Sequence, residues 1–520
     1  MAQENPVRTL PRIDQLVDFT RIRALRLLGS GTRAGRAGRA ALTRSGRRSG
    51  GLLATCSQIL HRLDAGQQVP WDELRPVLDA VLERADAARA RSRTERSDAW
   101  ADLAVRLAYH RSTHSGPAHS PLMLRAEEFL APFRASASGR ALLLDPDQAP
   151  VHGPEQKAAR AHGDRPLRVL ILCHSSWTFV RRVEADLEEH ANVEFRSVDV
   201  STLPLPERPT HGLVLRQRSA WNRDGTLRPV PSALEEPLAW ADTVFVEWGT
   251  QPFAWFSLLD LSPFEARIVA RIHRFEGLTP YPMLARGAAY DAICFVSSPL
   301  RTFFESVSPR ITQSGRRFTF HNMHSLESFT PSPDPHRFEL LQIGWAVPVK
   351  DVSFSLEVIR RLREIDDRYV LRLVGPTLEE TRTTGTAAWT EKIAHQVAEL
   401  GEGVVVDGFR SDIPDLLAEA GFILSTSVVE GTHESVAEGA VAGCIPVVRD
   451  WPEIVPWGGA GMVYPAEWIV ADVDAAVHRI LSFPDAAAFD AAAAAARAWV
   501  LESRRPESIR ADYLDFLSGS

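Results

Sequence analysis

The segment from Glu430 to Val448 holds two carboxylates eight positions apart around an expected helix start. An apolar run before it, Gly421–Ser427, predicts a buried parallel strand, and Gly443 predicts the helix end. A helix N-terminus offers unpaired N–H groups and the positive end of its dipole, which suits a diphosphate. Because an ionised glutamate only accepts hydrogen bonds, Glu430 and Glu438 suit sugar and ribose hydroxyls. The pattern suits a nucleotide-sugar site, although this spacing taken alone is more typical of two ordinary surface carboxylates.

A second loop with chemistry lies upstream, between a predicted strand that ends at Gly344 and a predicted helix from about Val352. Lys350 lies in this loop. Its flexible ammonium group is suited to negative charge that builds on a leaving phosphate. A lone lysine in a loop is more often a solvated surface residue, so the role of Lys350 depends on the pattern around it.

Glu430, Glu438, Gly443 and the Pro446–Val448 run together resemble the signature of family four retaining glycosyltransferases of GT-B architecture, the glycosyl transferases group 1. The resemblance implies that Glu430 holds the donor sugar and Glu438 the ribose. It also implies that Lys350 contacts the diphosphate of the donor, that the reaction retains the anomeric configuration, and that no cofactor and no obligatory metal is needed.

The sequence departs from the family pattern at three places in the predicted donor site. Thr432 and His433 stand where the family usually has an aromatic residue and a glycine. Trp345 stands where the family has an arginine. The expected donor-binding residues are Gly344, Gly375, Gly408, Phe409, Gly431, Thr432, His433, Ser435 and Glu438, and the expected catalytic residues are His273, Lys350 and Glu430.

Strand and helix patterns alternate through both halves of the chain from about residue 165, which favours parallel sheets with right-handed crossovers. In the C-terminal half, the further predicted strands are Tyr369–Gly375 and Val404–Phe409, and Trp451–Pro465 resembles the loop, strand and turn of the family. In the N-terminal half, five β-rich runs predict a Rossmann-like sheet: Leu167–Cys173, Val193–Val200, Thr243–Gly249, a strand within Ala266–Glu276, and Ala292–Ser298.

Candidate residues of the first sheet lie where its strands end, because ligands of such sheets bind at the carboxyl ends. His273 resembles the cleft histidine that the family places near the donor sugar and the incoming hydroxyl, and a structural histidine is the alternative. Glu276 is expected to face the cleft on the acceptor side, although Arg274 and Glu276 also fit an ordinary ion pair. Ser175 and Ser176 are the other expected acceptor-side residues, in a loop where many relatives have glycines.

The domain organisation follows from these patterns and from a proline-rich stretch at Thr330–His336, which suits a short stiff linker. The fold class is therefore α/β of GT-B type, with two Rossmann-like domains that face a cleft and an N-terminal, mainly helical extension. The predicted boundaries are a basic arm at 1–50, the helical extension at 51–160, the first Rossmann-like domain at 161–330, the hinge at 331–336, the second Rossmann-like domain at 337–500, and a last helix at 501–520 that packs back on the first domain.

The charge of the chain is concentrated at its N-terminus. Residues 1–50 hold eleven arginines and three acidic residues, a net charge of +8, so the remaining residues carry −15 of the total of −7. The alternatives for this arm are a disordered solvated segment and attraction to an anionic lipid surface or another polyanion. Nucleic-acid binding is a weaker hypothesis, because the chain outside the arm is acidic and has no recognised motif.

Composition places the protein among cytoplasmic globular proteins. No apolar stretch approaches the roughly 20 residues of a membrane span. Four scattered cysteines without metal spacing predict reduced core residues. We therefore expect a cytoplasmic location, with peripheral attachment to the inner face of the membrane through the basic arm as a further expectation.

These observations predict a glycosyltransferase that moves a sugar from a nucleotide diphosphate donor to a hydroxyl of a glycan, a lipid-linked glycan or another surface polymer. Its partners would be the nucleotide-sugar donor and the glycan acceptor, with no specific nucleic acid. The alternative is a catalytically silent GT-B scaffold that serves as a binding or assembly module. The missing loop arginine and first-loop glycines support that alternative.

Overall fold

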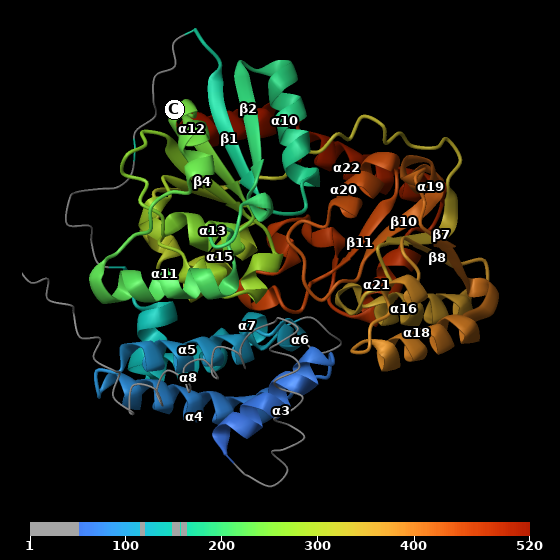
Figure 1. The fold of residues 1–520 in the computed structure, drawn as a ribbon. Coiled ribbons are helices and arrows are strands. Elements are labelled where there is room, and N and C mark those ends of the chain that lie inside the picture. Colours follow the sequence, from blue (N-terminus) through green and yellow to red (C-terminus); the bar gives the residue numbers. More distant parts are fainter. Residues whose placement is uncertain (1–50, 115–119, 148–156, 158–163, 520) are drawn as a thin grey trace, which may run out of the picture. The chain divides into compact units, whose positions relative to one another are not determined.

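The computed structural model describes residues 51–114, 120–147, 157 and 164–519 (Figure 1). Residues 1–50, which include the predicted basic arm, lie outside the described residues. Contacts divide the chain into two compact units. The smaller unit contains the described residues up to His110 together with Leu130–Leu143. The larger contains Arg111–Phe129 and the chain from Leu144 onward, again within the described residues.

The smaller unit is a set of packed helices. Leu74, Leu78, Val81 and Leu82 recur at helical spacing on α4, and their burial shows that this face forms the core of the unit. Asp86 at the end of α4 accepts hydrogen bonds from Ser136 and Ser138. The helices of this smaller unit are α3 (Leu52–Asp64), α4 (Trp71–Arg89), α5 (Thr94–Ala108), the end of α8 (Ala126–Ala135), α9 (Ala137–Gly139) and the π-helical turn η2 (Arg140–Leu144).

The first sheet of the larger unit is parallel throughout, in the order β2-β1-β3-β4-β5-β6. Most of its strands are apolar runs that are buried on both faces, as expected of a parallel sheet covered by helices. The strands are β1 (Leu167–Cys173), β2 (Val193–Asp199), β3 (Thr243–Glu247), β4 (Arg267–Ile272), β5 (Ala292–Phe295) and β6 (Arg316–Thr319). The principal helices are α10 (Thr178–His190), α11 (His211–Asp224), α12 (Ser232–Trp240), α13 (Gln251–Ser257), α14 (Tyr281–Leu284) and α15 (Ser298–Val307), with short 3₁₀ turns η3 (Val200–Thr202), η4 (Phe275–Leu278), η5 (Gly287–Ala289) and η6 (Ile311–Gln313).

The second sheet is also parallel and has the order β12-β11-β10-β7-β8-β9. Figure 1 shows α16, α18 and α21 on one face and α19, α20 and α22 on the other. The strands are β7 (His336–Ile343), β8 (Val370–Val374), β9 (Val404–Gly408), β10 (Ala420–Ser425), β11 (Ile445–Arg449) and β12 (Ile469–Val470). The helices are α16 (Val352–Ile365), α17 (Leu378–Thr381), α18 (Ala387–Leu400), α19 (Ile413–Glu419), α20 (Glu434–Ala442), α21 (Val473–Leu481) and α22 (Ala486–Ser503), with 3₁₀ turns η7 (Pro348–Lys350), η8 (Gly401–Gly403), η9 (Val455–Trp457), η10 (Ala460–Met462) and η11 (Ala466–Trp468).

The last helix, α23 (Pro506–Ser518), returns to the first sheet. Its side chains Ile509, Tyr513, Phe516 and Leu517 are buried in the same apolar cluster as β1 and α10. The second Rossmann-like domain and the first are therefore connected twice along the chain, through the segment before β7 and through α22 and α23.

A segment that precedes the first sheet in sequence contacts both Rossmann-like domains. It contains the remaining short helices of the larger unit, α6 (Arg111–His114) and α7 (Pro121–Leu124). The backbone N–H of Ser120 donates to Glu453 (2.7 Å), and the indole of Trp457 donates to the carbonyl of Met123 (2.8 Å). Helix α7 also contacts η4 of the first domain. Two hydrogen bonds and this contact thus bridge the domains at one point.

One predicted strand is wrong. The sequence pattern of Trp451–Pro465 predicts a loop, strand and turn, whereas the structure has η9 and η10 there and no strand. Gly458 and Gly459 both have positive φ, which interrupts extended backbone, and the last strand of the sheet is formed later by β12.

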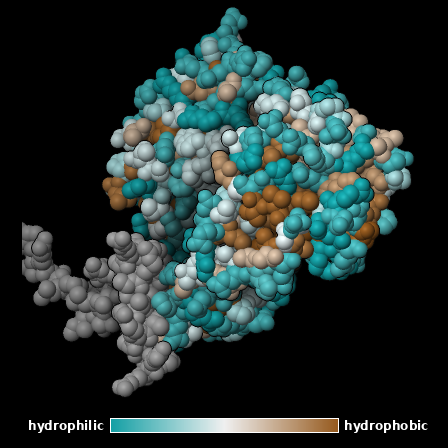
Figure 2. All heavy atoms as spheres, turned by 90° about the vertical axis from the view of Figure 1, so that its right-hand side faces the viewer, coloured by the Kyte–Doolittle hydropathy of each residue, from teal (hydrophilic) through white to brown (hydrophobic). Residues whose placement is uncertain are grey.

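The surface on the side of the second domain is mainly hydrophilic with a hydrophobic area gathered within it (Figure 2). The edge strand β9 exposes Val405 and Val406. Within the ranges that the structure describes, none of the helices combines the length and the hydropathy that a bilayer crossing requires.

Candidate functional site

Three glycines mark the carboxyl ends of the adjacent strands β7, β8 and β9. Gly344, Gly375 and Gly408 all have positive φ, in the region that favours glycine. Gly375 donates to the carbonyl of Gly408 (2.9 Å), and a Cβ on Gly375 would lie 3.3 Å from the nitrogen of Gly344. The backbones of the three turns at Gly344, Gly375 and Gly408 therefore pack closely together, and we call this surface the main-chain floor. The side chain of Phe409, the residue after Gly408, is 77% exposed.

Lys350, in η7 beside this floor, is the central cation of the site. Its Nζ donates to Oε1 of Glu430 (2.7 Å) and lies 3.1 Å from Nε2 of His433. The side chain is 20% exposed. An ammonium group has three N–H donors. Two are used by Glu430 and His433, which leaves one donor for a ligand without disruption of the existing contacts.

Glu430 lies in the loop between β10 and α20 with its side chain 10% exposed. Oε1 also accepts from the hydroxyl of Ser427 (2.7 Å), and Oε2 lies 4.0 Å from Nε of Arg274 on the first domain. Burial raises the pKa of Glu430, but the neighbouring charges, Lys350 first and Arg274 among them, together with the hydrogen bond from Lys350, outweigh it and hold this pKa far below its ordinary value. The carboxylate is ionised, and Oε2 keeps the capacity to accept a hydrogen bond.

His433 is the N-cap of α20 and has left-handed backbone, with φ of 45°. Because Lys350 only donates, Nε2 of His433 must accept, and Nδ1–H then donates to Ser425 Oγ (2.5 Å). That hydroxyl oxygen also accepts from the indole of Trp451 (3.0 Å). Burial and the charge of Lys350 lower the pKa of His433 to about 3, so the imidazole is neutral. The hydrogen bonds of the ring to Lys350 and Ser425 hold His433 in the left-handed backbone conformation, which few non-glycine residues adopt.

The start of α20 has no side-chain cap. The ring of His433 does not cap the helix, so no side chain satisfies the N–H groups of the first turn, of which that of Val436 donates to the carbonyl of His433 (2.9 Å). The Ser435 hydroxyl in that turn is buried without a hydrogen-bond partner among the described residues. The charge of Glu434 is compensated separately. Burial raises its pKa, but Arg504 and hydrogen bonds from Thr432 and Asn322 hold it at about 2.

Glu438, one turn further along α20, is not turned to bulk solvent. Its Oε1 accepts from Nε2 of His324 (2.7 Å), and the side chain is 18% exposed. Gly431, an expected donor-binding residue, also lies against the first domain. A Cβ there would lie 3.1 Å from Val296 and 3.3 Å from Leu300, so this glycine allows the loop to approach the first domain. Thr432 is also buried, and its hydroxyl donates to Glu434 (2.6 Å).

His273, at the carboxyl end of β4, is held by a buried network. Its Nε2 is 3.0 Å from Oε1 of Glu247, and its ring stacks on Trp248 at 4.0 Å between centroids. Glu247 also accepts two hydrogen bonds from Arg271 (3.0 and 2.7 Å), whose guanidinium donates to the hydroxyl of Tyr513 on α23. Burial raises the pKa of Glu247, but Arg271 and His273 outweigh it and lower this pKa. Since an ionised Glu247 accepts from Nε2–H, Nδ1 is the ring atom left with a lone pair.

The expected position of Glu276 needs correction. The side chain does not face a cleft but is fully buried, and its Oε1 accepts from the backbone N–H groups of Gly249 and His273 (both 2.9 Å). It shapes the loop that carries His273. It does not pair with Arg274, whose Nε lies 4.0 Å from Oε2 of Glu430 instead. Burial raises the pKa of Glu276.

Ser175 and Ser176 follow β1 and are exposed, as acceptor-side residues would be. The carbonyl of Ser176 accepts from the indole of Trp248 (3.3 Å). This bond links the first loop to the ring that stacks on His273.

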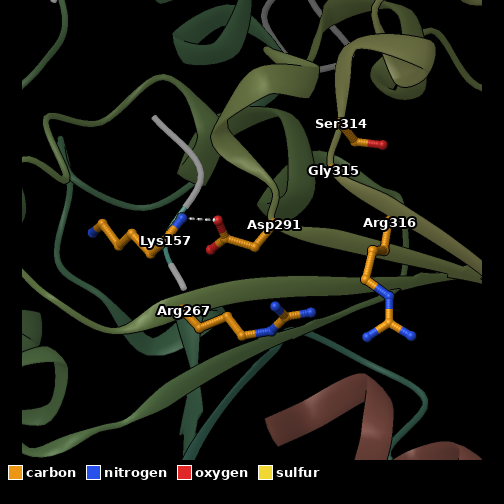
Figure 3. Close-up of a pocket in the computed structure, with 6 residues that line it drawn as sticks. All are labelled: Lys157, Arg267, Asp291, Ser314, Gly315 and Arg316. Carbon is orange, nitrogen blue, oxygen red and sulfur yellow. Dashed lines mark hydrogen bonds between the residues drawn. The ribbon is translucent and has the colours of Figure 1, made fainter. Parts of the chain in front are cut away.

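A cavity of about 400 Å³ lies elsewhere, at the amino ends of β4, β5 and β6 (Figure 3). Arg267 and Arg316 line it, and both guanidinium groups are committed to the last turn of α23. Arg267 donates to the carbonyl of Phe516 (3.4 Å), and Arg316 forms a bidentate pair with Asp515 (2.7 Å for both bonds). Cations at a helix C-terminus are favourable, so this cluster has a structural explanation.

Several residues of the site were missed by sequence reasoning. Glu247 and Arg271 interrupt apolar strands, and they are direct partners in the β3–β4 register. A charge of each sign inside two buried strands was the available signal. The contact of Arg274 with Glu430 joins residues far apart in sequence, and no local pattern indicates it.

Residues 337–483, which include Lys350, Glu430, His433 and Glu438, match the family model of glycosyl transferases group 1. The chain contains a glycosyl transferases group 1 domain. The matched range corresponds to the second sheet and most of its helices. The sequence matches no curated protein.

Solved structures of the GT-B type share the fold of the larger unit. Sucrose-phosphate synthase from Thermosynechococcus elongatus matches with a TM-score of 0.50 and 15% identity over 68% of this chain and 100% of that one. HepE from Anabaena, in complex with UDP, matches with a TM-score of 0.50 and 16% identity over the same shares. TarM matches with a TM-score of 0.45 and 16% identity over 55% of this chain and 57% of its own length. The predicted GT-B fold, with two Rossmann-like domains, is confirmed.

Proposed function

We propose that the protein is a retaining glycosyltransferase that moves a sugar from a nucleotide diphosphate donor to a hydroxyl of a glycan or surface polymer. The observation that carries this proposal is the cluster of Lys350, Glu430 and His433 at the uncapped start of α20, inside a glycosyl transferases group 1 domain. It combines a spare ammonium donor and an ionised acceptor, and Lys350 also lies within hydrogen-bond distance of the ring of His433, the N-cap residue of α20.

Each part of the cluster has a role in sugar transfer. The diphosphate binds the first turn of α20 and the third N–H of Lys350, so negative charge that develops on the leaving phosphate meets fixed donors. Glu430 accepts a hydrogen bond from a sugar hydroxyl through Oε2. Glu438 holds a ribose hydroxyl with the oxygen that His324 does not occupy. The three glycine turns and the exposed Phe409 receive the nucleoside.

The first domain contributes His273 and the acceptor side of the site. With Nε2 directed to Glu247, His273 presents Nδ1 as an acceptor for a sugar or acceptor hydroxyl. The exposed hydroxyls of Ser175 and Ser176 suit contacts with a polyhydroxylated acceptor. The departing phosphate takes up the acceptor proton. Closure of the two domains assembles the site, and the protein acts in the cytoplasm on acceptors at the inner face of the membrane.

A donor screen tests this proposal. The protein is incubated with nucleotide-diphosphate sugars, with and without glycan acceptors, and release of nucleoside diphosphate is measured. UDP-sugars come first, because HepE was determined with UDP. NMR of the product gives its anomeric configuration, which we expect to match that of the donor. Absence of turnover with every donor, or inversion of configuration, would contradict the proposal.

The second candidate is a catalytically silent GT-B scaffold. Its support is that Lys350 is already held by Glu430 and His433, and that Trp345 is buried where the family has an arginine. Calorimetric titration with a panel of nucleoside diphosphates separates the candidates. The enzyme gives heat of binding with at least one member, whereas a scaffold without a donor site gives none.

A further inference from the structure

Arg274 brings a second cation to the proposed donor site from the other domain. It follows His273 at the end of β4, and its side chain is 26% exposed. Its Nε lies 4.0 Å from Oε2 of Glu430. A Cβ built on Gly431 would lie 3.9 Å from the Cβ of Arg274, so the first domain packs closely on the loop before α20 at this point.

The hydrogen-bond capacity of Arg274 is unused. A guanidinium group carries five N–H donors in a planar fork. Its contact with Glu430 is an ion-pair distance that is too long for a hydrogen bond. No hydrogen bond joins this guanidinium to another of the described residues. A cation that is three-quarters buried and makes no hydrogen bond is unusual, because buried charges are normally paired and hydrogen-bonded.

The charges around Arg274 do not balance. Lys350 and Arg274 contribute two positive charges, and Glu430 contributes one negative charge. His433 is neutral in the tautomer that its two hydrogen bonds require, and Glu434 is balanced by Arg504. The cluster therefore has an excess of one positive charge next to the positive end of the α20 dipole, and one more anion would complete it.

We propose that Arg274 is a second diphosphate-binding residue, supplied by the first Rossmann-like domain to a donor held on the second. This inference rests on the proposed function. The planar fork fits two phosphate oxygens at once, whereas Lys350 acts as a point charge. The same diphosphate then contacts both domains, so donor binding draws the two domains together. Arg274 thereby couples occupancy of the donor site to the position of the adjacent His273.

The test measures affinity for nucleoside diphosphates by calorimetry, starting with UDP, GDP, ADP and TDP. The tightest of these is titrated into the wild-type protein, Arg274→Ala and Arg274→Lys. The control is Arg196→Ala, which removes an exposed arginine paired with Glu236 in the same domain. The matching nucleoside, which lacks phosphate, is titrated in parallel by ligand-observed NMR.

We expect Arg274→Ala to weaken binding of the diphosphate by about 10- to 100-fold, the size typical of a charge-assisted hydrogen bond. Nucleoside binding should be unchanged, Arg274→Lys should restore part of the affinity, and the control should match the wild-type protein. Unchanged diphosphate affinity in Arg274→Ala would overturn the inference. An equal loss for the nucleoside would also overturn it. Absence of binding by the wild-type protein would instead overturn the proposed function.

Discussion

The carboxyl edges of the two sheets each carry a cluster of a basic residue, a glutamate and a histidine, and the two clusters differ in how their charges are satisfied. On the first sheet, Glu247 and Arg271 are completely buried and His273 nearly so, and each charge is matched by a partner inside the protein. On the second, Lys350 is 20% exposed and retains an unused donor. The first cluster is arranged to hold a side chain still, whereas the second keeps the donor to which the proposed function assigns the diphosphate.

This difference follows from where the partners come from. Glu247 and Arg271 are neighbours in one sheet, so their pairing is fixed when the sheet forms. Lys350, Glu430 and His433 lie in loops beyond the strands, where the chain is free to present donors outward. Two parallel sheets of six strands, with different strand orders, therefore carry a tightly paired cluster at one carboxyl edge and a cluster with an unused donor at the other.

The largest effect is expected where a buried pair is broken. Arg271→Ala leaves the Glu247 carboxylate buried without its main partner, so the free energy of unfolding should fall by about 3–5 kcal/mol. Urea denaturation followed by circular dichroism measures it. A loss below about 1 kcal/mol, the size of an exposed ion pair, would show that the first cluster is not the rigid element described here.

Lys350→Ala should lower turnover strongly and stability only weakly. Loss of a donor that stabilises developing charge typically costs about 100- to 1,000-fold in turnover. The loss of stability should be smaller than for Arg271→Ala, because Glu430 keeps its hydrogen bond from Ser427 and the neighbouring charge of Arg274. Initial rates of nucleoside diphosphate release and a melting curve test both statements. Wild-type turnover would contradict the role of Lys350.

The pH dependence of stability sharpens the contrast, because His433 belongs to the second cluster. An unfolded histidine has a pKa of about 6.5, whereas burial and Lys350 lower the pKa of His433 to about 3 in the folded protein. As pH falls below 6.5 only the unfolded chain takes up this proton, so stability present above pH 6.5 is lost progressively toward pH 3. His321, whose pKa is lowered to about 4 by burial, adds to the loss.

The slope of the unfolding free energy against pH tests whether His433 causes this loss. Each such histidine contributes up to about 1.4 kcal/mol per pH unit in its window. Urea midpoints measured from pH 7 to pH 4 should fall less steeply in His433→Asn than in the wild-type protein. Equal slopes would mean that His433 titrates as an ordinary exposed histidine.

The smallest effect concerns the backbone of His433. Left-handed backbone costs an L-residue about 1–2 kcal/mol, which glycine avoids. His433→Gly and His433→Ala both lose the ring hydrogen bonds, so His433→Gly should be the more stable of the two by about 1 kcal/mol. Denaturation midpoints decide this, and the reverse order would contradict the strained conformation.

The sequence predicted the parts of this molecule that depend on local pattern. The predicted strand Leu167–Cys173 has the bounds of β1, and Gly443 ends α20 in left-handed backbone. The short strands β6 and β12 were missed, since four residues with two arginines and two residues alone carry little apolar periodicity.

Tertiary contacts account for what the sequence did not reveal at the site. The pairing of Glu247 with Arg271 needs the register of two strands, and the approach of Arg274 to Glu430 needs both domains. Glu276 was expected to face a cleft because it closely follows a strand. Two backbone N–H groups instead draw its carboxylate inward. Such bonds have no signature in a single sequence.

A crystal structure with bound nucleoside diphosphate tests the central claim most directly. We predict that the phosphates lie against the first turn of α20, with one oxygen bonded to Nζ of Lys350 while Glu430 and His433 keep their present contacts. A nucleotide bound elsewhere, for example in the cavity beside Arg267 and Arg316, would contradict the assignment of the donor site.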